Sequence, residues 1–399
     1  DLVSTTALRR MKHCLVAAAL TLCTALAPAA PLPAADSPPS ATAFFQRAAI
    51  RAPKLSPSGR FLAIQAAGKG DRMWLAVLDL QTLQPPQFIA GFSDADIAQQ
   101  HWISEDRLVF EVSNTPDGTS RLNGQGLWAI NRDGSQQRQL IKTDKPLLTE
   151  ASLIADRRLE VNWVLYGVPP ALDGSEVIVA RRPWLHERGA GLQLARLDTR
   201  TGLTRNLSEG IPDRSVAWVL DWRGEPRVID TLQQGRSRVY RRDAGGRWQP
   251  WFDDDPQARQ HAVPMWIGPD GLVLGQQNDR GFNAIFRLDP DTGRADAEPL
   301  VSTPGYDFNG RLITEPGTGR LLGVRYETDA PGTVWFDPAM KAHQAAIDAR
   351  LPGTVNLIEC LRCAAASHAL RSRLKRAMFI SLSAIWVTMN CRRWVTSAL

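Results

Sequence analysis

The central part of this sequence contains no cysteine. All five cysteines of the 399 residues lie outside residues 36–359: Cys14, Cys23, Cys360, Cys363 and Cys391. A disulfide framework is therefore excluded as the source of stability for the central part. Cys360 and Cys363 have C-x-x-C spacing, but a zinc site needs a second pair or nearby histidines, and only His368 follows. A short-loop disulfide is the commoner outcome in an oxidising compartment, and the role of the pair stays open.

Sequence signatures of catalysis and of nucleotide binding are also missing. There is no G-x-S-x-G, no P-loop, no G-x-G-x-x-G and no H-E-x-x-H. The nearest approaches to a nucleophile motif are Gly118–Leu122 and Gly235–Val239, which lack the last glycine and are expected in hairpin loops. Scattered histidines without i, i+4 pairing are expected on the surface or in loops: His101, His186, His261 and His343. No catalytic, cofactor-binding or metal residue is assigned, and no cofactor is expected.

Two acidic clusters can be interpreted either as ordinary turns and loops or as cation ligands. Asp289–Gly293 resembles the start of a calcium loop but lacks the acidic residue at the twelfth position. Leu197–Gly202 repeats the same pattern, which favours an ordinary strand-to-strand turn at both places. Asp253–Pro256 is expected to be a solvated acidic loop, although propeller loops also gather ligands at a channel mouth.

An excess of one charge is absent from the central part. The whole chain is formally +6, but residues 36–359 keep 37 of the 47 basic and 40 of the 41 acidic residues, a net charge of −3. The remaining basic residues lie in the two ends. The basic character of the whole chain therefore gives no reason to expect nucleic-acid binding.

No apolar run is long enough for a membrane span of ~20 residues. The longest N-terminal run, Cys14–Ala27, follows the basic start Met11-Lys12 and precedes small residues such as Ala27-Pro28-Ala29. This order predicts a secretory signal peptide over 11–35, after an upstream extension over 1–10. The protein is thus expected to be exported, to the periplasm or the extracellular space.

What the sequence does have is a repeat of about 48 residues. Polar turns recur between apolar segments, and their markers are 47, 68, 50, 47 and 48 residues apart: Gly59, Asp106, Gly174, Gly224, Gly271 and Gly319. A period of ~40–50 residues built from short strands predicts a β-propeller.

Each unit contains a second set of turns. These turns are expected to close further hairpins, and they lie at Asp133-Gly134, Thr201-Gly202, Gly245-Gly246, Thr292-Gly293 and Asp337-Pro338. Two hairpins per period give four strands, which make one blade. The fold class is therefore all-β, a β-propeller with six readable four-stranded blades over residues 36–359. A seventh blade begins near Val355–Ile358 and is incomplete at its C-terminal end.

The last 40 residues differ from the rest. Residues 360–399 contain seven Lys or Arg and no Asp or Glu, and the last glycine is Gly353. We expect no domain in this aberrant basic tail. A basic, partly helical tail and a frame disruption near residues 360–364 are both open.

The aromatic residues suit the gaps between blades. Trp128, Trp218, Trp248 and Trp335 lie on or beside predicted strands and are expected to fill those gaps. A sugar-stacking role for Trp222 or Trp251 would need an exposed ring.

Four segments resemble one known family. They are Ala52–Ala63, Ala76–Leu80, Trp102–Phe110 and Asp221–Arg227, the last with the pattern D-x-x-G-x-x-R. Together they look like blades of the N-terminal propeller of prolyl-oligopeptidase-type serine peptidases, the S9 group, which includes dipeptidyl and acylaminoacyl peptidases. The resemblance covers about residues 44–359. TolB-like propellers begin blades with similar turns.

The resemblance implies a propeller that limits the access of short peptides to an α/β-hydrolase domain carrying the Ser, Asp and His of the triad. No position matches the catalytic motif, so this chain alone is expected to be inactive, truncated before the catalytic domain. The alternative is a TolB-like periplasmic propeller that binds a protein partner and has no enzymatic activity.

Overall fold

The apolar segments of the repeat form β-strands that pair antiparallel with their neighbours in sequence. In the computed structural model, the residues described are 50–68, 72–82, 84–113, 125–143, 157–169, 174–184, 186–187, 189–254, 263–315, 317–362, 367–374 and 381–387. All of them belong to one compact unit, Ala48–Leu399. The second strand of the first unit, Phe61–Ala67, shows why these segments pack: its first six residues are buried on both faces. Such a strand needs a neighbouring sheet on each side.

Four sheets have four strands each, and every strand pairs antiparallel. Blade 1 contains β1 (Ile50–Leu55), β2 (Phe61–Ala67), β3 (Met73–Asp79) and β4 (Gln87–Ala90). Blade 2 contains β5 (Asp96–Trp102), β6 (Arg107–Ser113), β7 (Gln125–Asn131) and β8 (Arg138–Thr143). Blade 3 contains β9 (Trp163–Gly167), β10 (Glu176–Arg181), β11 (Gln193–Asp198) and β12 (Thr204–Asn206). Blade 4 contains β13 (Ser215–Leu220), β14 (Pro226–Gln233), β15 (Arg236–Arg242) and β16 (Trp248–Asp254).

Three further sheets have three strands each among the described residues. Blade 5 contains β17 (Val263–Ile267), β18 (Val273–Asp279) and β19 (Phe282–Leu288). Blade 6 contains β20 (Gly310–Thr314), β21 (Leu321–Glu327) and β22 (Pro331–Trp335), followed by the helix α3 (Pro338–Arg350). Blade 7 contains β23 (Thr354–Arg362), β24 (Ser367–Leu374) and β25 (Ser381–Val387).

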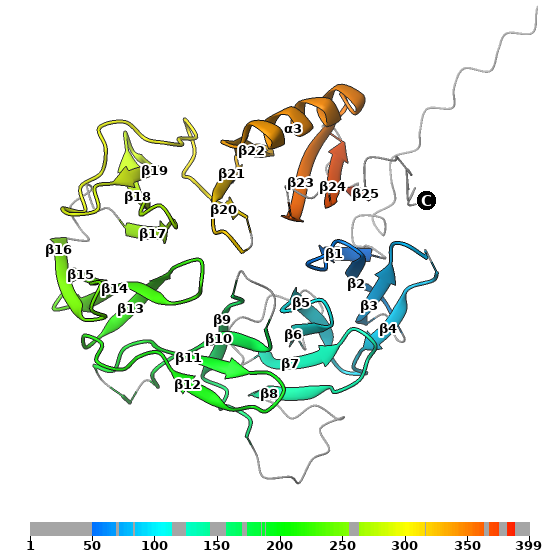
Figure 1. Cartoon of the computed structure of the whole chain (residues 1–399), viewed down its shortest axis with the longest axis horizontal. Helices are drawn as coiled ribbons and strands as arrows, with labels where there is room; N and C mark the ends of the chain where they lie inside the picture. The colour runs from blue at the N-terminus through cyan, green and yellow to red at the C-terminus, as the bar shows by residue number, and fades with distance from the viewer. Residues whose placement is uncertain are drawn as a thin grey trace, which may run out of the picture. The chain divides into compact units, whose positions relative to one another are not determined.

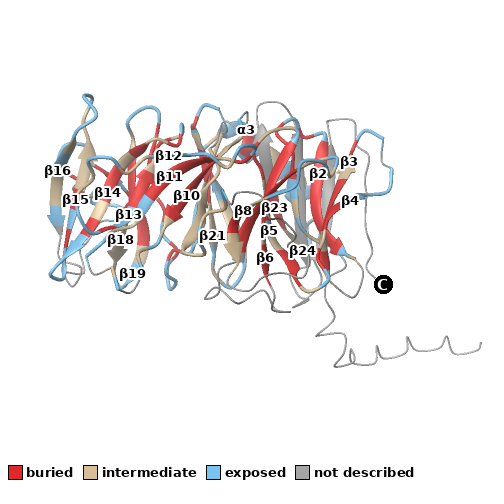
Figure 2. Ribbon diagram, turned by 90° about the horizontal axis from the view of Figure 1, so that it is seen from below, coloured by how far each residue is buried: buried red, intermediate tan, exposed pale blue. Residues whose placement is uncertain are grey.

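The sheets follow one another in chain order around a common centre (Figure 1). The first strand of each sheet is the innermost one, and in blades 1–5 that strand carries extra residues in a β-bulge next to its neighbour. A bulge at the same place in successive units increases the local twist and turns the inner edge consistently. Seen edge-on, buried residues gather within the strands, and exposed residues gather at both ends, where the turns lie (Figure 2).

The sequence therefore predicted the fold class correctly, an all-β propeller. The turns at Asp133-Gly134, Thr201-Gly202 and Gly245-Gly246 do join the third and fourth strands of blades 2, 3 and 4. Among the described residues, a complete fourth strand is found in blades 1–4. In blade 5 its place is taken by single bridges, Ile285 with Val301 and Leu288 with Ala295.

The turn predicted at Asp337-Pro338 is wrong. Asp337 is the N-cap of α3, its carboxylate accepts a hydrogen bond from Met340 N at 3.0 Å, and Pro338 opens the helix. Aspartate at the N-cap with proline just after it is a helix start signal, which the repeat pattern had concealed. Met340 is buried against Trp335 and Ile358, so α3 fills the space between blades 6 and 7.

The beginning of a seventh sheet near Val355–Ile358 is confirmed by β23. This strand runs from Thr354 to Arg362 and so includes residue 359, the expected end of the propeller. The backbones of β24 and β25 continue the sheet within the predicted tail. The remaining tail residues and the predicted segments 1–10 and 11–35 lie outside the described residues, so the domain boundaries stay predictions.

Tryptophans fill the gaps between blades, as predicted. Trp128 stacks on Phe110 with ring centroids 6.0 Å apart and joins a core shared with Phe61 and Leu75 of blade 1. Trp218 of blade 4 packs with Ile178 and Leu194 of blade 3, and its Nε1 donates to Leu192 O at 3.0 Å. The propeller core is thus a series of layers between sheets rather than one centre.

Candidate functional site at the inner turns

The turns that join the first and second strands of each sheet form the candidate site. All innermost strands run in the same direction in a propeller, so these inner turns gather at one mouth of the central channel. They include the polar segments that resemble the S9 propellers. Loops at the end of a rigid scaffold are where binding residues commonly lie.

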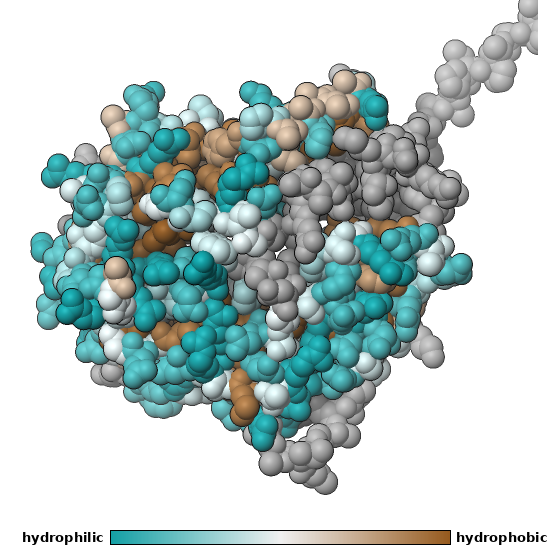
Figure 3. Space-filling view, viewed as in Figure 1, coloured by the Kyte–Doolittle hydropathy of each residue, from teal (hydrophilic) through white to brown (hydrophobic). Residues whose placement is uncertain are grey.

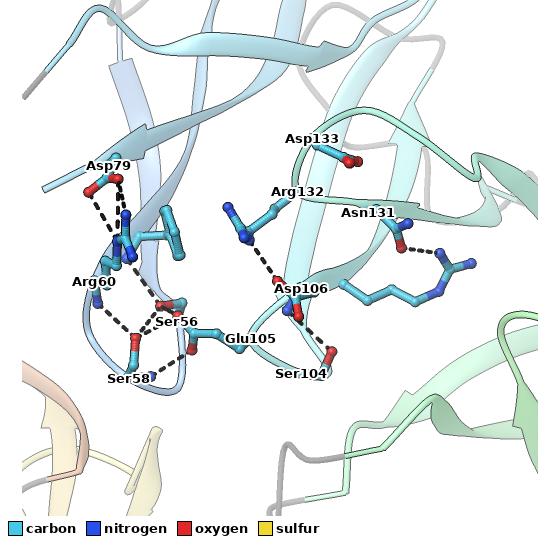
Figure 4. Close-up of polar contacts among 12 residues, drawn as sticks. Ser56, Ser58, Arg60, Asp79, Ser104, Glu105, Asp106, Asn131, Arg132 and Asp133 are labelled. Carbon is cyan, nitrogen blue, oxygen red and sulfur yellow. Dashed lines mark hydrogen bonds and ion pairs between the residues drawn. The ribbon is translucent and has the colours of Figure 1, made fainter. Parts of the chain in front are cut away.

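The inner turns of blades 1 and 2 are joined by hydrogen bonds (Figure 4). The Glu105 carboxylate accepts from Ser56 Oγ at 2.9 Å, from Ser58 Oγ at 2.5 Å and from Ser58 N at 2.9 Å. Ser56 is buried, and its Oγ also accepts from Phe61 N at 3.1 Å. One carboxylate therefore fixes the position of the neighbouring turn.

Beside this network, two guanidinium groups contact the ring of Phe61. Arg132 Cζ lies 4.2 Å and Arg60 Cζ lies 4.8 Å from the ring centroid. Each guanidinium is neutralised by its own carboxylate, Arg132 by Asp106 at 2.8 Å and Arg60 by Asp79 at 2.8 Å. The hydrogen bond from Arg60 lowers the pKa of Asp79. Both arginines already have partners, so this cluster joins blades and offers no free cation to a ligand.

The inner turn of blade 4 is held by one buried carboxylate. Asp221 accepts from Arg223 N at 2.9 Å, from Glu225 N at 3.0 Å and from Arg227 Nε at 2.7 Å. These bonds account for the pattern D-x-x-G-x-x-R. The first residue orders the backbone of the turn and the last residue neutralises its charge.

Trp222 at the tip of this turn reaches a sheet that is not its neighbour. A Cβ placed on Gly319, in the inner turn of blade 6, would lie 2.2 Å from Trp222 Cβ and 2.6 Å from Cγ. Gly319 has φ of +71° and is buried, so only glycine suits both the backbone and the space. Blade 5 lies between the two sheets, so the contact passes on the axis side of blade 5. In Figure 1 the β13–β14 and β20–β21 turns both extend toward the centre of the ring.

The exposed face of Trp222 is covered as well. Arg223 Cζ lies 4.6 Å from the Trp222 ring centroid, and the Arg223 side chain is exposed. A guanidinium over an indole ring is a favourable cation–π arrangement. Trp222 is thus half-buried between Gly319 and Arg223, and it is not the open ring that a sugar-stacking role would need.

Arginines fix neighbouring blades to one another. Arg107 of blade 2 is buried and donates to Thr199 Oγ1 at 2.9 Å and Thr199 O at 2.8 Å in blade 3. Burial lowers its pKa to about 10, so it remains charged at neutral pH. Arg196 of blade 3 donates to Glu225 at 2.9 Å and to Arg223 O at 2.8 Å, and it supports the turn that carries Trp222.

Two titratable groups of blade 2 have strongly shifted pKa values. Burial lowers the pKa of His101 on β5 to about 4, and the Lys54 charge adds to this. Burial raises the pKa of Glu111 on β6 to about 7. His101 pairs with Val109 across the strands, and Glu111 pairs with Gln99, so both side chains lie on the same face of the sheet. His101 is therefore neutral at pH 7, and Glu111 is partly protonated.

The structure separates the other sequence candidates. His186 is exposed, as predicted, whereas His101 lies on a strand and His343 on α3. The prediction that Ser237 lies in a hairpin loop is wrong, because Ser237 is buried on β15 and its Oγ donates a hydrogen bond to Asp230. The acidic loop predicted over Asp253–Pro256 is wrong at its start, because Asp253 and Asp254 end β16 and Asp253 forms an ion pair with Arg238 at 2.5 Å. Gly118–Leu122, His261 and Asp255–Pro256 lie outside the described residues.

The turn interpretation of Asp289–Gly293 is confirmed. Asp289 Oδ1 accepts from Asp291 N at 3.1 Å, Thr292 N at 2.7 Å and Thr292 Oγ1 at 2.8 Å. Asp198 makes the corresponding three contacts in its own turn. Within the described ranges, no group of three or more His, Cys, Asp or Glu is placed to hold a metal ion. None of the described helices is long and apolar enough to cross a membrane.

Comparison with known proteins finds solved structures that are similar to this chain. No protein-family model and no curated protein matches this chain. Among solved structures, the β-propeller domain of the trilobed protease from Pyrococcus furiosus is 13% identical, with a TM-score of 0.40, over 73% of this chain and 83% of that one. Acylaminoacyl peptidase from Pyrococcus horikoshii is 11% identical, with a TM-score of 0.37, over 87% of this chain and 51% of its own length. TolB from Acinetobacter baumannii is 14% identical, with a TM-score of 0.31, over 63% of this chain and 55% of its own length.

The solved structures similar to this chain thus include propellers of S9 peptidases and TolB-like propellers. The chain spans about half the length of the acylaminoacyl peptidase and of the TolB that it matches. At these identities and TM-scores the likeness carries no argument, so function must be argued from the site.

Proposed function

We propose that this chain is the substrate-gating propeller of an exported S9-type serine peptidase that acts on short peptides. Hydrolysis by a Ser nucleophile and a His base is assigned to the α/β-hydrolase domain of the intact enzyme. The chain itself supplies the channel and its mouth. Export follows from the signal peptide predicted over residues 11–35.

The observation that carries the proposal is the contact of Trp222 with Gly319. It joins the inner turns of blades 4 and 6 on the axis side of blade 5. In the proposed gate, this contact is what narrows the mouth of the channel. The ring is held by Asp221 through the turn and by Arg196 from blade 3. Trp222 and Gly319 both lie in turns, so the turns can move apart while the strands stay in place. A gate for small substrates requires such a movement.

Association kinetics of a fluorescent tripeptide with the purified chain test this proposal. Trp222→Ala should raise the association rate constant about tenfold, because the mouth is widened while the strands are unchanged. Trp184→Ala is the matched control, since Trp184 is 42% exposed and lies in the hairpin between β10 and β11. Equal rate constants for the wild type and Trp222→Ala would reject the gate.

The activity part of the proposal has its own test. The chain alone should not hydrolyse dipeptidyl or acylated chromogenic substrates. Turnover that a serine-directed phosphonate blocks would contradict it. For the intact enzyme, a reading frame encoding G-x-S-x-G after codon 359 is the expected finding.

A protein-binding propeller of the TolB type is the second candidate. Exposed apolar side chains on innermost strands favour it: Ile50 is 51%, Val216 is 49% and Val263 is 37% exposed. Figure 3 shows apolar side chains in separate patches among polar ones. If this candidate is correct, a protein partner should protect these residues from labelling and Trp222→Ala should not change peptide binding.

A further inference from the structure

One of the cationic side chains in the inner turns differs from the others. In blades 1–6, the residues between the first and second strands include three arginines and no lysine: Arg60, Arg223 and Arg320. Arg60 Nη2 lies 2.8 Å from Asp79 Oδ2, and Arg320 Nη1 lies 2.8 Å from Asp337 Oδ2. The Arg223 side chain is exposed, and no carboxylate of the described residues lies within ion-pair distance of it.

The two carboxylates of the same turn are already engaged by other arginines. Asp221 Oδ2 lies 2.7 Å from Arg227 Nε, and Glu225 Oε1 lies 2.9 Å from Arg196 Nη2. Around this turn, four guanidinium groups meet three carboxylates: Arg196, Arg205, Arg223 and Arg227 against Glu176, Asp221 and Glu225. Since the other three arginines have carboxylate partners, the charge that remains without a counterion in this group is that of Arg223.

The backbone of Arg223 is fixed on both sides of its side chain. Arg223 N donates to Asp221 Oδ1 at 2.9 Å, and Arg223 O accepts from Arg196 Nη2 at 2.8 Å. The guanidinium itself contacts the Trp222 ring, with Cζ 4.6 Å from the ring centroid. An ordered turn thus presents the Arg223 side chain on the ring that the proposed gate uses.

The ring contact leaves the hydrogen-bonding capacity of Arg223 unused. A cation–π contact uses the charge of the guanidinium and the face of the ring, whereas the five N–H donors lie in the guanidinium plane. No hydrogen bond from the Arg223 side chain is found among the described residues. A planar fork of donors matches the two oxygens of a carboxylate, and every short peptide with an unblocked C-terminus carries such a group.

We propose that Arg223 is a specificity-determining residue, which binds a carboxylate of the incoming peptide beside Trp222 at the channel mouth. The inference rests on the proposed gate and names the substrates that the gate favours, peptides that carry a carboxylate. Arg60 and Arg320 do not compete for that group, because each is neutralised by its own carboxylate. The C-terminal carboxylate and an acidic side chain share this chemistry, and different peptides distinguish them.

Association kinetics with the purified chain test the proposal. The probes are trialanine with an uncharged fluorophore on its N-terminus, the C-terminal amide of that peptide, and the same amide with glutamate in the middle position. At low salt, the peptide with the C-terminal carboxylate should associate about threefold faster than its amide. This preference should disappear at about 1 M salt, where the screening length is ~3 Å. Faster association of the glutamate peptide as well would show that any carboxylate is recognised, and a preference for the C-terminal carboxylate alone would show recognition of the peptide end.

Substitutions at Arg223 assign the preference to this residue. Arg223→Gln removes the charge and leaves both backbone hydrogen bonds of the residue in place, so the preference for a carboxylate should be lost. Arg223→Lys keeps the charge and should retain part of the preference. Arg60→Gln is the matched control, because it removes the same charge from another inner turn, where the arginine is already paired. The preference should remain in that variant.

Equal association rate constants for the wild type with the carboxylate peptides and with the amide would overturn the proposal. A preference that Arg223→Gln retains, or that Arg60→Gln also removes, would overturn it as well. The gate has a separate readout, because the trialanine amide carries no carboxylate. Its association rate constant with Trp222→Ala reports on the gate alone, so a failure of the gate and a failure of carboxylate recognition are distinguished.

Discussion

Blades 1 and 2 and blade 6 use the same repeat in different ways. Between blades 1 and 2, a continuous core of buried residues includes Leu75, Leu108 and Phe110, and both sheets have four strands. In blade 6 the sheet has three strands, and a smaller core that includes Leu322 and Trp335 is completed by α3. The repeat thus specifies the first three strands of a unit, while the covering of the outer edge is a separate, local solution.

The largest effect is expected at the buried arginine of blade 2. Arg107→Met removes the donors to Thr199, Asn131 and Gln136 and leaves the acceptors of the buried Thr199 unpaired. We expect a loss of about 3–5 kcal/mol in the free energy of unfolding, measured by urea denaturation. Arg60→Ala is the control, because this exposed ion pair should contribute little. A similar small loss for both variants would mean that Arg107 does not fix blade 2 to blade 3.

Two fully buried leucines compare the cores directly. Leu108 and Leu322 are both 0% exposed, one in each region. Leu→Ala should cost about 4–5 kcal/mol at Leu108 and about 2–3 kcal/mol at Leu322, since α3 can move into the cavity while flanking sheets cannot. The measurement is again urea denaturation. Equal losses would show that α3 is as rigidly packed as a sheet.

The pH dependence of stability depends on blade 2. The raised pKa of Glu111, about 7 against 4.5, means that its contribution is present below pH 4.5 and is lost as pH rises through 7. The lowered pKa of His101, about 4 against 6.5, means that its contribution is present above pH 6.5 and is lost as pH falls through 4. The temperature of thermal unfolding should therefore be highest between about pH 4 and about pH 7. In Glu111→Gln, the decrease in the free energy of unfolding as pH rises through 7 should be smaller by about 1–3 kcal/mol. The same decrease in the wild type and in the variant would contradict this account.

The helix cap of blade 6 is expected to give the smallest effect. Asp337→Ala removes the N-cap of α3 and the ion pair with Arg320 at 2.8 Å. The loss should be about 1 kcal/mol. Because the hydrogen bonds of the folded state lower the Asp337 pKa, its contribution is present above the pKa of the unfolded chain and is lost as pH falls. Asp337→Asn should retain most of the stability, and a loss equal to that of Asp337→Ala would show that the ion pair and not the cap is responsible.

The repeat made the architecture predictable from the sequence, whereas the tertiary contacts could not be predicted from it. Turn residues such as Gly59 and Gly224 marked the units because tight turns need their backbone freedom. Asp337-Pro338 was misassigned because the expectation of a hairpin outweighed a local helix signal. The contact of Trp222 with Gly319 joins positions 97 residues apart in different units. No local pattern encodes such a contact, although a tryptophan in one inner turn and a Gly-x-Gly in another were its visible components.

A reversible lock at the channel mouth tests the gate most directly. In the double variant Trp222→Cys with Gly319→Cys, a Cβ on residue 319 would lie 2.2 Å from the Cβ of residue 222, shorter than the ~3.8 Å of a disulfide. The inner turn of blade 6 must therefore shift outward to form the disulfide and to accept a residue other than glycine at a φ of +71°. The measurement is the association rate constant of a fluorescent tripeptide with the oxidised and with the reduced chain. The account predicts a rate at least tenfold lower in the oxidised chain, restored on reduction. Equal rates in the two states would contradict it.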